Sequence, residues 1–186
     1  MAGTLQVENL IGPTTGANAN KVSIPSGQIL YVPGHVIQHQ YSYYDYSGAS
    51  NETETTSSSW TASGFNVTIT PSSTSSRIIF MAALNIKRTV NSNQSYLDLQ
   101  VRRSIAGGAY AVTSPSEDDG DQARHSDHST TLEYTQLTLI VPDHPNTTSA
   151  VNYKVYIRNS IGSNSNVMRV GDNGSNEFVH VMEIAQ

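Results

Sequence analysis

The clearest concentration of metal-binding side chains in this 186-residue chain is one short acidic run. Glu117-Asp118-Asp119-Gly120-Asp121 offers several carboxylate oxygens in a single loop, which is what a hard cation such as Ca²⁺ requires. The spacing departs from that of an EF-hand loop, and the distal glutamate is absent. We therefore interpret the run as a solvated surface loop and predict no metal there.

Two histidine pairs are the next candidates. His125 and His128 flank Asp127, but zinc takes three or four ligands and the segment supplies no third. One histidine from each chain around a threefold axis would supply three, at the cost of an added assumption. His35 and His39 stand at an even spacing at the start of a strand, which could place both on one face, although a structural role is favoured.

The last of the six histidines falls inside the final strand of the chain. His180 shares its parity with Phe178 and Met182. We expect a buried, hydrogen-bonded imidazole at this position, because an apolar parity normally faces a core.

Catalytic motifs are missing from the sequence. It contains no phosphate-binding glycine loop, no G-x-G-x-x-G, no H-E-x-x-H and no G-x-S-x-G. Glu133, Glu177 and Glu183 are present, but no pattern pairs them as the two carboxylates of a glycosidase. We predict that the chain is not an enzyme, has no catalytic residue, and binds neither a cofactor nor a metal.

The most distinctive local feature is a cluster of tyrosines, Tyr41, Tyr43, Tyr44 and Tyr46, with Asp45 between the last two. Flat amphipathic rings beside a hydrogen-bond acceptor suit stacking on a sugar or contact with a protein. Tyrosine is also a common strand residue, and a seam between subunits would use the same side chains. Structural packing is favoured over a receptor contact, and both interpretations stay open.

Strands must position these residues, because hydrophobic side chains alternate with polar ones along most of the chain. The alternating segments are 65–70, 97–102 and 151–157, and the final run 177–184 is a further strand. Arg77 to Ile86 is apolar on both faces, so we place it centrally in a sheet or against a subunit contact. Leu132 to Val141 changes parity near Thr135 and Gln136, which predicts a β-bulge.

Together these segments predict an all-β fold. About eight strands, separated by polar turns and without an amphipathic helix, favour an antiparallel β-sandwich of the jelly-roll kind over residues 35–186. Residues 1–34 differ, since short strand-like pieces alternate there with Gly and Pro turns and cannot bury a core alone. We interpret them as an extended arm for attachment or trimerisation; an ordinary arm packed on its own domain is the alternative.

Composition narrows the functional classes. The net charge of −5 and the scattered basic residues argue against a nucleic-acid partner. The chain has no cysteine, no apolar run long enough to span a membrane, and no signal-peptide pattern at Met1 to Leu10. We expect no membrane insertion, and we expect release by lysis as part of a virion.

Several turn-and-strand motifs resemble fibre-like structural proteins of marine phages and cyanophages. The motifs are 3–10 (GTLQVENL), 16–28 (GANANKVSIPSGQ), 59–64 (SWTASG), 67–78 (VTITPSSTSSRI), 146–153 (NTTSAVNY) and 182–185 (MEIA). The resemblance implies a virion component, usually trimeric, whose N-terminal segment attaches to other virion proteins and whose β-domain projects from the particle.

The expected function is therefore structural: a tail fibre or fibre tip on the exterior of a virion that presents its β-domain for host attachment. A homotrimer would gain avidity for a host-surface glycan or protein from three weak sites. A head fibre or capsid decoration protein is the alternative within this class. A stand-alone carbohydrate-binding β-sandwich is the alternative outside it.

Overall fold

The structure, a computed structural model, describes residues 11–17, 22, 24–26, 30, 32–44, 52–89, 95–113, 122–127, 133–161, 167–171 and 176–186. The chain divides into two units, Met1–Tyr31 and Val32–Gln186. The described residues of the first unit form no helix or strand, and Ile11, Val22, Ile24 and Leu30 are exposed there. Whether this unit is an attachment arm stays a prediction.

The second unit is built from β-strands. Its described residues contain eleven: β1 (Val36–Tyr44), β2 (Thr53–Thr55), β3 (Thr61–Ile69), β4 (Arg77–Thr89), β5 (Ser95–Ile105), β6 (Ala111–Val112), β7 (Ala123–Asp127), β8 (Glu133–Asp143), β9 (Val151–Asn159), β10 (Val167–Val170) and β11 (Glu177–Ile184). None of the described residues belongs to a helix that could cross a membrane.

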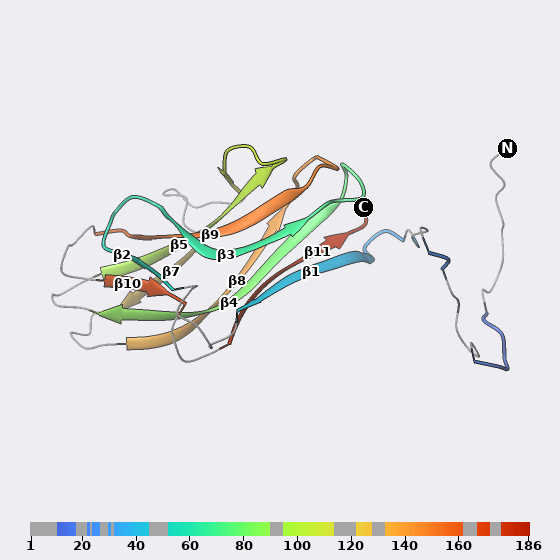
Figure 1. Cartoon of the computed structure of the whole chain (residues 1–186), viewed down its shortest axis with the longest axis horizontal. Coiled ribbons are helices and arrows are strands. Elements are labelled where there is room, and N and C mark those ends of the chain that lie inside the picture. Colours follow the sequence, from blue (N-terminus) through green and yellow to red (C-terminus); the bar gives the residue numbers. More distant parts are fainter. Residues whose placement is uncertain are drawn as a thin grey trace. The chain divides into compact units, whose positions relative to one another are not determined.

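The strands form two sheets, which Figure 1 shows as stacked layers of this unit. One sheet has the order β1-β11-β4-β8, with β10 and β2 extending it beside the second half of β4. The other has the order β3-β9-β5-β7, with β6 also paired to β5. All the pairings are antiparallel.

The strand order is that of a jelly roll. The first long strand pairs with the last (β1 with β11), the second with the next to last (β3 with β9), and successive pairs alternate between the sheets (β4 with β8, β5 with β7). The prediction of an antiparallel β-sandwich with about eight strands is therefore confirmed. The three short strands, β2, β6 and β10, only extend it.

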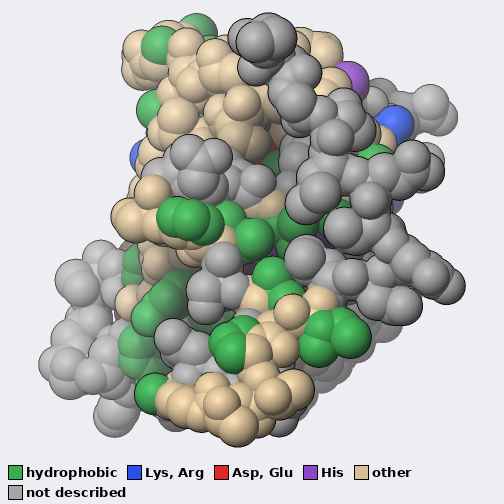
Figure 2. Space-filling view, turned by 90° about the vertical axis from the view of Figure 1, so that its right-hand side faces the viewer, with side chains coloured by type: hydrophobic (Ala, Val, Ile, Leu, Met, Phe, Trp, Pro, Cys, Tyr) green, Lys and Arg blue, Asp and Glu red, His purple; other side chains and the backbone are tan. Residues whose placement is uncertain are grey.

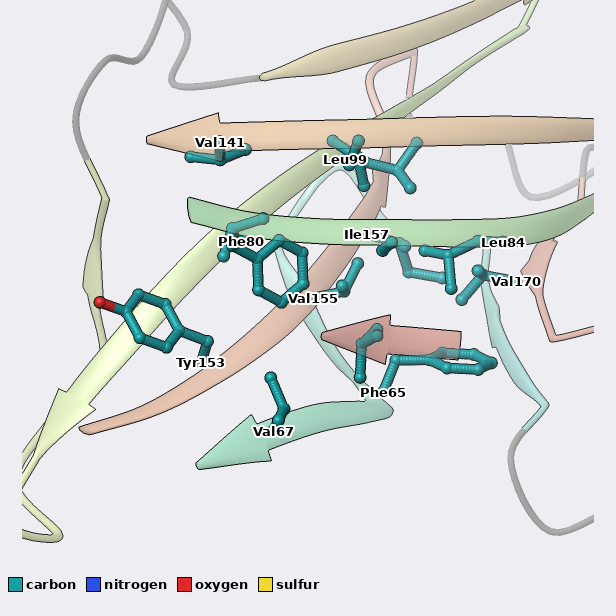
Figure 3. Packing of buried hydrophobic residues seen from close by; sticks show 14 of the residues in the cluster. Phe65, Val67, Phe80, Leu84, Leu99, Val141, Tyr153, Val155, Ile157 and Val170 are labelled. Atoms are coloured by element: carbon teal, nitrogen blue, oxygen red, sulfur yellow. The ribbon is translucent and has the colours of Figure 1, made fainter. Parts of the chain in front are cut away.

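The core lies between the sheets, because one parity of each strand is apolar. Phe65, Val67 and Tyr153 from one sheet meet Phe80 and Leu84 from the other, and all five are buried (Figure 3). In β9 the burial alternates residue by residue along the whole strand. The period-2 segments of the sequence thus point their apolar side chains inward, as expected.

Strand β4 is central, as its two apolar faces predicted. It pairs with β11 and β10 on one side and with β8 on the other. The bulge predicted in β8 is wrong, since Glu133–Asp143 pairs with Arg88–Ile78 in one unbroken register. The parity change arises because Tyr134 points outward, where its ring lies 5.4 Å from the ammonium group of Lys87.

Candidate functional site

The four tyrosines singled out in the sequence do not form one cluster. Tyr41 and Tyr43 lie on the outer face of β1, where they are 68% and 55% exposed. Tyr44 has the opposite parity and packs edge-on against Phe65, with ring centroids 4.7 Å apart. The Tyr44 hydroxyl donates to the carbonyl of Asn66 (2.9 Å) and accepts from its N–H (2.8 Å). Tyr46 lies outside the described residues.

A shallow hollow of about 360 Å³ opens at Tyr41 and Tyr43. Its lining comes from two neighbouring strands, β1 with His39, Tyr41 and Tyr43, and β11 with Phe178 and His180. The lining contains no carboxylate and no Lys or Arg. The hollow therefore suits an apolar side chain or a flat ring better than a charged ligand.

Two imidazoles meet at the floor of this hollow. Nε2 of His39 and Nδ1 of His180 are 3.0 Å apart, so one ring donates a hydrogen bond to the other. Tyr41 stacks on His39, and Phe178 packs edge-on against His180. Burial lowers the pKa of His180 below its ordinary value, and charge on His39 lowers that pKa further. The neutral form of the His180 imidazole is therefore favoured.

The expectation that His180 lies in the core is wrong. Phe178, His180 and Met182 do share one parity, but that parity faces outward, and Val179 and Val181 fill the core. The expected hydrogen bond is present, with His39 as the partner. His180 is half-buried, and its Nε2 has no hydrogen-bond partner among the described residues.

The hollow belongs to a larger apolar surface, the outer side of the β1-β11-β4-β8 sheet. Three successive rows of side chains cross all four strands without an Asp, Glu, Lys or Arg. The first row holds His39, Met182, Ile79 and Pro142; the second Tyr41, His180, Met81 and Ile140; the third Tyr43, Phe178, Ala83 and Thr138. We call these twelve residues the apolar face.

Several members of the apolar face are strongly exposed. Ile140 on the edge strand β8 is 65% exposed, and Phe178 on β11 is 42% exposed. Figure 2 shows a different side of the molecule, where hydrophobic side chains of described residues also reach the surface. Exposed apolar side chains that cluster in this way are typical of interaction sites.

The outer side of the β3-β9-β5 sheet is polar by comparison. The carboxylate of Asp98 accepts hydrogen bonds from Nε of Arg124 (2.7 Å) and Nε of Arg158 (2.9 Å). The guanidinium of Arg102 lies 4.4 Å from the ring centroid of Tyr156 and 5.7 Å from that of Trp60. These charges find partners within the chain, so this face is stable in water without a cover.

Neither His35 nor His125, the remaining candidates that the structure describes, lines the hollow. The Glu117–Asp121 run and His128 lie outside the described residues. His125 is on β7, opposite Leu97 of β5, while His35 is exposed just before β1. His35 and His39 do not share the strand face, because the β1 register shifts between Val36 and Gln38. No group of three His, Asp or Glu side chains within the described part of the chain could hold a metal ion.

Sequence reasoning missed most of the apolar face. Met81 and Ile140 are far from the tyrosines in sequence, and only strand pairing brings them into one row. The available signal was the apolar outer parity of 77–86 and 177–184 together. The chain matches no protein-family model, and no curated protein is significantly similar to it.

Proposed function

We propose that the chain is a non-enzymatic structural component of a phage virion, a fibre-type appendage that presents a β-sandwich for attachment to the host surface. One observation carries the proposal: the two outer sheet faces differ, one apolar and suited to assembly, the other polar and suited to solvent. A protein that is fixed in an assembly and projects from it needs both kinds of surface.

Two further features support this function. Residues 1–31 form a unit distinct from the sandwich, in keeping with a separate segment for attachment. The apolar hollow and the internally paired charges of the opposite face contain no grouping of a nucleophile, base and oxyanion donors, which fits a binding or structural role. The resemblance to fibre-like virion proteins points the same way.

Immunoelectron microscopy tests the proposal. Antibodies against the sandwich should label the exterior of intact particles from lysates that contain the protein. Label at the tail identifies a tail fibre or fibre tip, and label over the capsid identifies a head fibre or decoration protein. Protein found only in the soluble fraction, with unlabelled particles, would contradict a virion role.

The arm is tested separately by deleting Met1 to Asn20. The truncated protein should keep the circular dichroism spectrum of a folded β-domain, because the sandwich core lies wholly within Val32–Gln186. It should no longer join particles, because the attachment segment has been removed. Loss of the β-sheet spectrum after deletion would show that residues 1–20 belong to the fold and would contradict the attachment role.

One observation favours a second function, that of a stand-alone carbohydrate-binding module. Trp60, Tyr110 and Tyr156 are only half-buried on the polar outer face, and partly exposed rings can stack on sugars. Binding of the purified protein to a glycan array, together with unlabelled particles, would support this module over the virion component.

A further inference from the structure

The apolar face is a continuous surface of twelve residues without a charged side chain of Asp, Glu, Lys or Arg. With strands about 4.8 Å apart and same-face residues about 6.8 Å apart, its twelve side chains cover roughly 400 Å² of sheet. The largest apolar patch on a soluble monomer typically covers about 300–600 Å², and a patch of this size is often functional. Interfaces between proteins commonly have an apolar centre surrounded by a polar rim.

The absence of charge from the apolar face indicates what covers it. The chain carries a net charge of −5, so two copies repel each other unless their charged groups are kept out of the contact. The three rows of the face contain no Asp, Glu, Lys or Arg, while Asp98, Arg102 and Arg158 lie on the opposite sheet. A differently charged partner would be recognised through complementary charges, and this face offers none. A second copy of the chain meets the requirement.

The shape of the face indicates how the copies meet. The second row has the hollow at one end, beside Tyr41 and His180, and the protruding Ile140 at the other, on the edge strand β8. A hollow and a protrusion at opposite ends form a head-to-tail contact between copies, which closes into a ring when the rotation permits. A ring of three agrees with the proposed fibre.

We propose that the apolar face is the contact between copies of this chain, with Ile140 of one copy entering the hollow lined by His39, Tyr41, Tyr43, Phe178 and His180 of the next. This inference rests on the proposed function, because a fibre-type appendage is built from several copies. It assigns Tyr41 and Tyr43 to the subunit contact and leaves the β3-β9-β5 face to the surroundings.

Charge introduced into the face tests the proposal in the full chain. Ile140→Asp and Tyr41→Asp should each reduce the mass measured by light scattering from that of the wild-type assembly to the 20.1 kDa of one chain. Both positions are more than half exposed, so each variant should keep the wild-type far-ultraviolet circular dichroism. Val112→Asp is the matched control, since Val112 is 39% exposed on the other sheet, and it should keep the wild-type mass.

Cross-linking identifies the contact directly, because the chain has no cysteine of its own. In a Tyr41→Cys, Ile140→Cys double variant, the two sites of one chain are three strands apart, roughly 14 Å, which is beyond the reach of a disulfide. Any disulfide must therefore join two copies, and covalent dimers and trimers are expected on a non-reducing gel.

Three results would overturn the inference. One is a wild-type assembly that persists in both Asp variants and yields no cross-linked species, which would place the contact on another face. Another is a wild-type protein that is monomeric at all concentrations. The apolar face would then be covered by residues 1–31 of the same chain or by a different partner. The third is loss of the assembly in Val112→Asp alone. Particle labelling remains a separate test, so the proposed function can stand when this inference fails.

Discussion

The carboxylate of Glu183 accepts a 2.6 Å hydrogen bond from the hydroxyl of Ser76, 107 residues earlier in the chain. Ser72 donates to the same oxygen from its N–H (2.8 Å) and its hydroxyl (2.7 Å), and Gln38 donates to the other oxygen (2.6 Å). Glu183 is fully buried. This one side chain therefore joins β11 to β1 and to the turn before β4, and it brings together two segments that carry the fibre-like resemblance.

Glu183→Gln should destabilise the domain by roughly 2–4 kcal/mol, because an amide leaves some of these buried donors without an acceptor. Urea unfolding measures the change in the free energy of unfolding. Glu54→Gln is the control, since that carboxylate is half-exposed in its ion pair with Arg169 and should contribute less than about 1 kcal/mol. An equal decrease in the free energy of unfolding in the two variants would contradict a special role for Glu183.

The same carboxylate makes the stability of the domain depend on pH in the acidic range. Burial alone would raise the pKa of Glu183, but hydrogen bonds from Ser76, Gln38 and Ser72 outweigh it and hold the pKa below its ordinary value of 4.5. A lowered pKa in the folded state means that the stabilisation is complete above about pH 4.5 and is lost as the pH falls through the folded value. Melting temperatures measured across this window should fall more steeply for wild type than for Glu183→Gln, and parallel curves would contradict the assignment.

Tyr44→Phe should separate the inward tyrosine from the two outward ones. The Tyr44 hydroxyl is bonded to both backbone groups of Asn66, so its removal should cost roughly 1–2 kcal/mol in urea unfolding and leave the mass of the assembly unchanged. Tyr43→Phe, which removes a hydroxyl from an exposed ring, should change stability by less than about 0.5 kcal/mol. A larger effect at Tyr43 would contradict the orientation of β1.

Acid should dissociate the assembly. His39 and His180 share one hydrogen bond, and the groups facing them are Tyr41 from β1, Phe178 from β11 and Met81 from β4, none of which carries a negative charge. The pKa of His180 is lowered from 6.5, so stability is complete above about pH 6.5 and is lost as the pH falls through the folded value. A protonated His180 imidazole in the hollow would then face the apolar side chain of Ile140 of the neighbouring copy, and burying that charge without a partner is costly.

Light scattering between about pH 7.5 and about pH 5 should accordingly show the mass falling toward that of one chain. The double variant His39→Gln, His180→Gln should lose this dependence in that range. His144→Gln, at an exposed position outside the apolar face, should keep it. A wild-type mass that is constant over the whole range would contradict burial of the histidine pair between copies.

Local pattern predicted the parts of the fold that depend on burial alone. Alternation along 65–70, 97–102 and 151–157 identified β3, β5 and β9, and the apolar segment Arg77 to Ile86 identified a central strand. Partner strands could not be predicted, because pairing joins residues such as His39 and Met182 that are distant in sequence. The jelly-roll order emerges only from those pairings.

The misplaced side chains have a shared physical cause. Strand β11 is apolar on both faces, because one covers the core and the other belongs to the apolar face, so its sequence alone cannot reveal that Val179 rather than His180 points inward. The same ambiguity suggested a bulge in β8, where the large ring of Tyr134 faces outward. An apolar outer face thus misleads a prediction that equates apolar with buried.

The solution molar mass of the wild-type chain, measured by light scattering over a range of concentrations near neutral pH, tests the central claim most directly. The account predicts a mass near three times the 20.1 kDa of one chain, because the apolar face must be covered by neighbouring copies. A mass of 20.1 kDa at every concentration would contradict the account, because the apolar face would then be either open to water or covered by something other than a second copy.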